Sequence, residues 1–196
     1  MEDKQLNEKE SLELITQMIR NTQRGLEKSN GIPFLIWGYT TIVVSLLVWY
    51  SFSTTGNPQW NYLWFAIPVI SFPLMMWFLK KQEKGVKTYI DRIIAYVWIV
   101  FGIAALVVST SAMFLWSLPI LFIMVLMMAA GTSITGLIIQ FRALIFSGFA
   151  GILLSYLCLI IKGYESILVF ALIFLVMMVI PGHVLNYKSR KNDESR

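Results

Sequence analysis

Six long apolar runs make up most of this sequence, and they constrain its fold more than any other feature. Each run is long enough to cross the hydrocarbon core of a bilayer, which takes roughly 20 apolar residues in a helix. A helix satisfies its backbone hydrogen bonds within one segment, so we expect each run to be a transmembrane helix. The six runs are 32–52, 60–79, 93–113, 118–139, 143–161 and 166–185.

The composition agrees with this interpretation. The chain has 196 residues, of which 57% are hydrophobic and only 14% are charged. Soluble proteins carry about 25% charged residues, so this chain has too little charge to coat a surface that faces water. Six spans leave too few residues for a sizeable soluble domain. The predicted fold class is all-α, a polytopic membrane bundle of six transmembrane helices.

The positive charges predict how the bundle is oriented. Fifteen of the 16 Lys and Arg residues fall on one side of the six runs, and Lys162 alone falls on the other. Basic loops stay in the cytoplasm, so we expect both termini to be cytoplasmic. Charged residues before the first run predict the absence of a signal peptide.

The loop between the second and third runs is the most basic segment on that side. It is expected to contact anionic lipid headgroups, because each basic residue near the membrane surface adds about 1 kcal/mol of attraction. The residues expected to make this contact are Lys80, Lys81, Lys84, Lys87 and Arg92. We expect no nucleic-acid partner, since the basic charge is a property of this membrane face.

Residues 7–29 have the pattern of an amphipathic helix before the first span. Asn7 is suited to cap this helix, and Asn30 with Gly31 is expected to end it before Pro33 begins the span. Its apolar face should contact the membrane, the bundle or another protein, including a second copy of the chain. The residues expected to contact a partner are Leu12, Ile15, Ile19 and Leu26. We therefore divide the chain into a cytoplasmic helix and linker (1–31), a transmembrane domain (32–187) and a basic cytoplasmic tail (188–196).

Small and hydroxyl residues gather in the fourth and fifth spans. Several recur at intervals of four, a spacing that lets two helix backbones approach closely in lipid. The members of this strip are Gly131, Thr132, Thr135, Gly136, Gln140, Ser147, Gly151 and Ser155. Two interpretations are open: close packing of spans four and five, or a polar crevice that opens near Gln140 toward the cytoplasm.

The second span contains Pro68 and Pro73. Each proline removes a backbone hydrogen bond, so we expect a kink or local unwinding near the middle of the membrane. Broken helices of transporters usually come as a pair in two related halves. No second span repeats the pattern, which favours a kinked structural helix over a gate.

Residues that could carry catalysis are scarce in the spans. His183 is the only histidine, Cys158 is the only cysteine, and no carboxylate falls inside a predicted span. Neither a nucleophile with its base nor a metal-ligand set can be assembled from these groups. The cluster of Met124, Met127 and Met128 could bind Cu(I), but such residues more often fill packing space. We expect no enzymatic activity, no metal and no cofactor.

Three short motifs carry a resemblance to a known group of proteins. They are ESLELI followed by MI within residues 10–19, LIWGY at 35–39 and PGH at 181–183. With them the chain resembles small six-span inner-membrane proteins of bacteria. The resemblance implies a fold and a place in the bacterial inner membrane, but no particular activity. In length, span count and the glycine spacing of spans four and five it is also similar to the HdeD-type acid-resistance membrane proteins.

The sequence thus favours a non-enzymatic integral membrane protein with a sensory, regulatory or interaction role through its cytoplasmic face. Its partners would be the lipid bilayer together with a cytoplasmic protein or further copies of the chain. The alternative is a small-solute transporter or channel, suggested by the prolines of span two and the strip on spans four and five. A charged substrate is hard to accommodate, because no charged residue lies inside the predicted spans.

Overall fold

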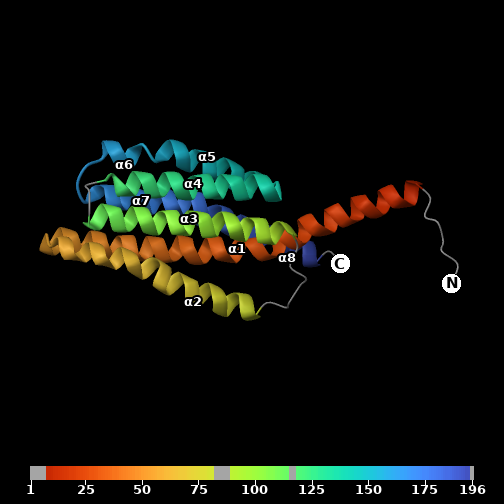
Figure 1. The fold of residues 1–196 in the computed structure, drawn as a ribbon, viewed down its shortest axis with the longest axis horizontal. Helices are drawn as coiled ribbons and strands as arrows, with labels where there is room; N and C mark the ends of the chain where they lie inside the picture. The colour runs from red at the N-terminus through yellow and green to blue at the C-terminus, as the bar shows by residue number, and fades with distance from the viewer. Residues whose placement is uncertain (1–7, 82–88, 115–117, 195–196) are drawn as a thin grey trace.

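The computed structural model describes residues 8–81, 89–114 and 118–194, and the regular structure of these residues is helical, without a strand (Figure 1). Six helical segments in this described part are long and apolar enough to cross a membrane. They are Gly31–Thr55, Pro58–Phe78, Tyr89–Phe114, Ile120–Ile139, Arg142–Ile160 and Glu165–Lys188. The expected all-α polytopic bundle is confirmed, and the chain is a multi-pass membrane protein.

The first helix, α1 (Glu8–Thr55), is one continuous helix of 48 residues. The expectation that Asn30 and Gly31 end the N-terminal helix is therefore wrong, and no linker separates that helix from span one. Glycine at position 31 lets α1 pack closely against the last span, because a Cβ there would overlap the side chain of Asn186. Pro33 lies inside α1. Asn7, the expected cap, lies outside the described residues.

The interior of the bundle is formed by α1, by spans four and five, and by the last span. Span four is α4 (Ile120–Ile139), and span five is α5 (Arg142–Leu154) followed by the single turn α6 (Leu157–Ile160). The last span joins α7 (Glu165–Phe174), the π-helical turn η2 (Leu175–Val179) and α8 (Ile180–Glu194). Fully or almost fully buried side chains from these helices form the core; they include Val48, Val125, Leu144, Phe170 and Met177.

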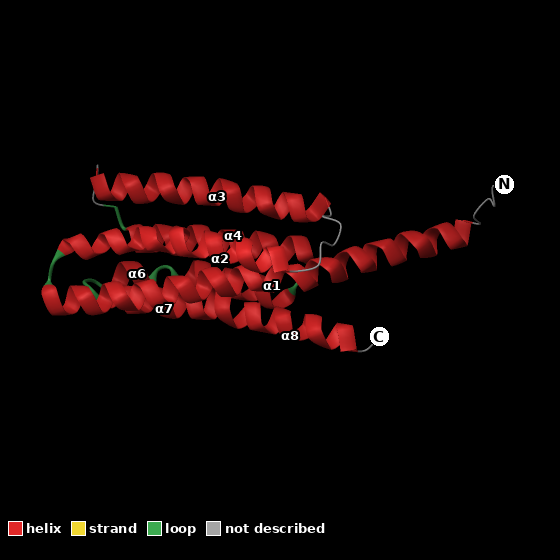
Figure 2. Ribbon diagram, turned by 90° about the horizontal axis from the view of Figure 1, so that it is seen from below, coloured by secondary structure: helices red, strands yellow, loops and turns green. Residues whose placement is uncertain are grey.

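Spans two and three lie at the edge of the bundle. Span two consists of a 3-10 helix, η1 (Pro58–Phe65), and α2 (Ala66–Lys81), whereas span three is α3 (Tyr89–Phe114). Figure 2 shows α3 as an outer helix beside α4. Ile94 is buried in α3. Many large apolar side chains of both outer helices are exposed. Such surfaces contact lipid in a membrane-spanning helix.

The prolines of span two accompany a change of helix type. The chain passes from 3-10 to α geometry at Ala66, two residues before Pro68, and Pro73 lies inside α2. This change lies in the first half of the span. Figure 1 shows α2 diverging from α1 toward the Lys81 end. Proline donates no backbone hydrogen bond, which is a physical reason for weaker helical geometry in this span.

Two other helix ends complete the description of the spans. Pro119 precedes α4 as its N-cap, without a side-chain hydrogen bond. The helix α8 continues to Glu194, so the basic tail is helical through that residue.

Candidate functional site

The glycines of spans four and five hold α4 and α5 in close contact. A Cβ at Gly136 would lie 2.7 Å from the backbone nitrogen of Ile145. A Cβ at Gly148 would lie 2.7 Å from the backbone nitrogen of Ser133. Real Cβ atoms do not approach backbone atoms this closely, so the two helices touch where a side chain would keep them apart.

Gly151 extends this contact to the last span. A Cβ on Gly151 would lie 2.8 Å from the sulfur of Met177 and 3.0 Å from the Cβ of Ala129. Both of these neighbours are fully buried. Three spans therefore meet at this glycine.

The hydroxyl groups of α4 are bonded within their own helix. Thr132, Ser133 and Thr135 are buried, and each donates to the carbonyl four residues earlier at 2.8–2.9 Å. Because these donors are already used, the strip presents few free polar groups to a solute. Of the two interpretations left open by the sequence, this geometry favours packing.

Gly131 and Thr135 face span three instead of span five. The indole nitrogen of Trp98 donates to Thr135 Oγ1 at 3.2 Å, and the ring of Trp98 packs edge-on against Phe34 with centroids 5.7 Å apart. A Cβ at Gly131 would lie 3.4 Å from the ring of Phe101. The predicted strip is thus divided between two neighbouring helices, because its residues occupy more than one face of α4.

Gln140 follows α4 as its C-cap. Its φ of 55° places it in the left-handed region, and its side chain is exposed. The backbone nitrogen of Phe141 donates to the Gly136 carbonyl at 2.9 Å, and that of Gln140 donates to the Leu137 carbonyl at 3.3 Å. These two bonds define a Schellman motif, in which glycine is the usual residue at the left-handed position.

Ser147 links α5 to the last span at a proline. Pro181 has no N–H to offer the Met177 carbonyl four residues earlier. Ser147 Oγ lies 3.3 Å from that carbonyl, where it donates a hydrogen bond, and 3.2 Å from the Leu144 carbonyl of its own helix. The π-helical turn η2 contains Met177, and its residues Met177, Met178 and Val179 are buried. The hydroxyl of span five therefore supports the backbone of span six where its regular hydrogen bonding is interrupted.

Ser155 marks the break between α5 and α6. It is fully buried, and its hydroxyl donates to the Ile152 carbonyl at 2.6 Å. The next turn is tightened, because the nitrogen of Cys158 bonds the Ser155 carbonyl three residues earlier at 3.0 Å. The sequence predicted a single transmembrane helix for span five. The apolar residues around Ser155 do not indicate the break between α5 and α6.

A polar pair joins α1 to α8 at the surface of the bundle. Tyr39 Oη lies 2.7 Å from His183 Nε2, and the two rings meet edge-on with centroids 5.9 Å apart. A Cβ at Gly38 would lie 2.8 Å from Val179, so the glycine beside Tyr39 lets α1 approach the last span. This contact gives His183 a hydrogen-bond partner. Sequence reasoning did not find the pair, because its members are 144 positions apart.

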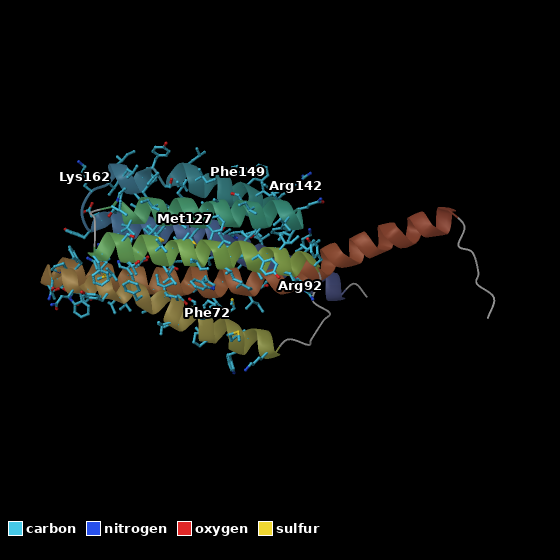
Figure 3. The ribbon with its side chains drawn as sticks, in the orientation of Figure 1. Phe72, Arg92, Met127, Arg142, Phe149 and Lys162 are labelled. Atoms are coloured by element: carbon cyan, nitrogen blue, oxygen red, sulfur yellow. The ribbon has the colours of Figure 1, made fainter. Side chains whose placement is uncertain are left out.

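Three of the described basic residues mark the two ends of the bundle. Figure 3 shows Arg92 and Arg142 at one end of the bundle and Lys162 at the other. Lys80 and Arg92 are exposed, as contact with lipid headgroups requires. Nothing is described for the Lys81 side chain, and Lys84 and Lys87 lie outside the described residues.

The residues expected to contact a partner lie on the part of α1 that extends beyond the bundle. Figures 1 and 2 show this part, residues 8–30, leaving the end of the bundle as a continuation of span one. Leu12, Ile15, Ile19 and Leu26 are helical here, and no contact of their side chains is described. These four residues therefore belong to the same helix as span one. A helix stop at Asn30 and Gly31 would have placed them in a separate helix.

Other candidate groups are not brought together into a site. Within residues 8–81, 89–114 and 118–194, no three His, Cys, Asp or Glu side chains are grouped as metal ligands. Met124 and Met128 pack against the hydrophobic core, and Cys158 is half-buried beside the same core. A shallow groove between α3 and α4 is lined only by Tyr and aliphatic or Phe side chains, such as Tyr96, Val97 and Ile134.

Comparison of the chain with family models, curated proteins and solved structures found no match. The resemblance to six-span bacterial membrane proteins accordingly stays a prediction.

Proposed function

We propose that this protein is a non-enzymatic integral membrane protein that acts through protein contacts at its cytoplasmic face, with residues 8–30 of α1 as the contacting element. The observation that carries this proposal is the continuity of α1 from Glu8 to Thr55. The helix that continues span one projects beyond the end of the bundle, inclined to the axis of the span (Figures 1 and 2). Its apolar positions are then presented to other proteins in the cytoplasm.

The charges on the extension also favour a protein over a lipid surface. The face opposite Leu12, Ile15 and Ile19 mixes acidic and basic residues, so its attraction to anionic headgroups is weak. Burial of one aliphatic side chain contributes roughly 1.5–3 kcal/mol, which makes an exposed apolar face unfavourable in water. Contact with a protein removes that face from water.

The sidedness follows from the basic residues. Both termini are proposed to be cytoplasmic, because the end of the bundle that carries Arg92 and Arg142 also carries the first and last residues of the spans. The proposed membrane is the bacterial inner membrane. The exposed Lys80 and Arg92 would contact anionic lipid at this face.

The transporter alternative loses its main support in spans four and five. The strip that suggested a crevice is held together by Gly136 and Gly148, and its hydroxyls bond to their own helix. The non-enzymatic assignment rests on the residues available, since the sequence contains one His and one Cys and no carboxylate in the interior of a span.

The test is photo-crosslinking from the extension in native membranes. A crosslinking amino acid at Ile15 should capture a protein, whereas the same group at Gln17, on the opposite face, should not. Ile15→Asp combined with Ile19→Asp should abolish capture from Leu12 and leave membrane insertion intact. Equal capture from both faces, or capture that survives the double substitution, would refute a specific contact at this helix.

A further inference from the structure

We propose that the partner of the α1 extension is a further copy of this chain, packed as a parallel and in-register coiled coil. This inference rests on the proposed function, because it names the partner of the same helix. Three observations carry it: the spacing of the apolar residues, the positions of the charges, and the continuity of α1 with span one.

The apolar residues of the extension follow the spacing of a coiled-coil seam. The steps from Leu12 to Ile15, Ile19, Thr22 and Leu26 are three, four, three and four residues. This alternation is the heptad repeat, with Leu12, Ile19 and Leu26 at position a and Ile15 and Thr22 at position d. An average spacing of 3.5 residues keeps one narrow seam facing a neighbouring helix.

The charges lie away from this seam. In the same register, every charged residue from 10 to 28 falls at position b, c or f, the outward positions of the heptad. These residues are Glu10, Glu13, Arg20, Arg24, Glu27 and Lys28. The flanking positions e and g, which select partners through their charges, are held in this segment by Ser11, Thr16, Met18, Gln23 and Gly25. Within residues 10–28, identical helices can therefore meet along the seam without repulsion between like charges, and no flanking charge in this segment favours a different protein. Lys9, at position e, precedes this segment.

The membrane sets the direction and height of the helices. Copies inserted with the same topology have parallel extensions, and α1 has no break between the extension and span one. Each seam residue thus stands at the same height above the membrane in every copy, which produces the in-register arrangement. Figures 1 and 2 show the extension beyond the ends of the other helices, so a second helix can lie beside it.

Tethering also compensates for the short length of the seam. The seam from Leu12 to Leu26 spans about two heptads, whereas a free coiled coil is usually indicated by at least three or four. Anchoring both helices in one bilayer raises their effective concentration, so a weak contact becomes populated. Leu at a with Ile at d does not favour two strands over three or four. Disulfide formation between identical positions is a suitable measurement, because it reports the contact in any of these assemblies.

The experiment uses the full-length chain with Cys158→Ala, purified and reconstituted into phosphatidylcholine vesicles. Ile19→Cys at position a is compared with Gln17→Cys at position f, under oxidation with copper phenanthroline. We expect disulfide-linked dimers with Ile19→Cys and their loss with Gln17→Cys. A second pair, Leu26→Cys and Arg24→Cys, should give the same contrast, and adding Ile15→Asp should abolish the Ile19 crosslink.

Two outcomes overturn the proposal. Equal dimer formation at positions a and f would indicate random collision, and no dimer at either seam position would exclude the self-contact. If the purified chain forms no seam crosslink while Ile15 captures another protein in native membranes, the proposed function stands and the second copy is wrong. If neither experiment gives a contact specific to the apolar face, both proposals fail.

Discussion

The close contact of α4 with α5 makes Gly148 sensitive to the smallest possible substitution. In Gly148→Ala, the new Cβ would lie 2.7 Å from the Ser133 nitrogen and 2.9 Å from its Cα. These are backbone atoms, so no side-chain rotation relieves the overlap, and one helix must move. Overpacking of this kind costs about 1–3 kcal/mol.

The matched control is Gly102→Ala in α3, where no atom lies within 4 Å of the new Cβ. Replacing a mid-helix glycine by alanine stabilises a helix by roughly 0.5–1 kcal/mol. This propensity gain applies to both variants and cancels in their difference. We therefore expect Gly148→Ala to be less stable than Gly102→Ala by about 1–3 kcal/mol.

The assay is unfolding of each purified variant by SDS in mixed detergent micelles, followed by the loss of helical circular dichroism. The unfolding midpoint should fall for Gly148→Ala and stay level or rise for Gly102→Ala. If both midpoints shift equally in the same direction, α4 and α5 are not in backbone contact at Gly148, and the packing argument is refuted.

Three further predictions use the same preparations or whole cells. Ser147→Ala removes the hydroxyl that donates to the π-helical turn, so it should lower the free energy of unfolding by roughly 0.5–1.5 kcal/mol in the SDS assay, and an unchanged midpoint would show that this bond contributes nothing. Gln140→Gly relieves a left-handed backbone that costs a non-glycine residue roughly 1–2 kcal/mol, so it should raise the SDS midpoint, and a lower midpoint would contradict the cap. In a Cys158→Ala background, Gly56→Cys should react with an impermeant maleimide added outside intact cells whereas Asn192→Cys should not, and the reverse pattern would overturn the orientation.

The spans could be predicted from the sequence because they depend on composition alone. A run of about 20 apolar residues has few stable conformations in lipid other than a helix. The proposed sidedness rests on the position of one residue, Lys162, in a chain whose other basic residues all fall on the opposite side. Neither property needs knowledge of which helices touch.

The details of α1 and the last span depend on contacts between distant residues, so the sequence could not supply them. Asn30 and Gly31 have the pattern of a helix stop, yet both lie inside α1. Glycine at position 31 fits a different requirement, because α8 packs where a side chain would be. The π-helical turn and its support by Ser147 likewise depend on a partner 30 positions away. The glycine strip was recognisable from its spacing, but its division between α3 and α5 was not, since spacing does not identify the neighbouring helix.

The unbroken α1 gives the molecule a lever arm. At 1.5 Å per residue its 48 residues measure about 72 Å, of which about 35 Å precedes Gly31. Gly31 and Gly38, pressed against the last span, form the fulcrum of this arm. Because α1 is continuous between the arm and the span, a tilt of about 10° of the whole helix displaces its N-terminal tip by about 6 Å. A force applied at the tip is transmitted in the same way to the far end of span one, across the full thickness of the membrane.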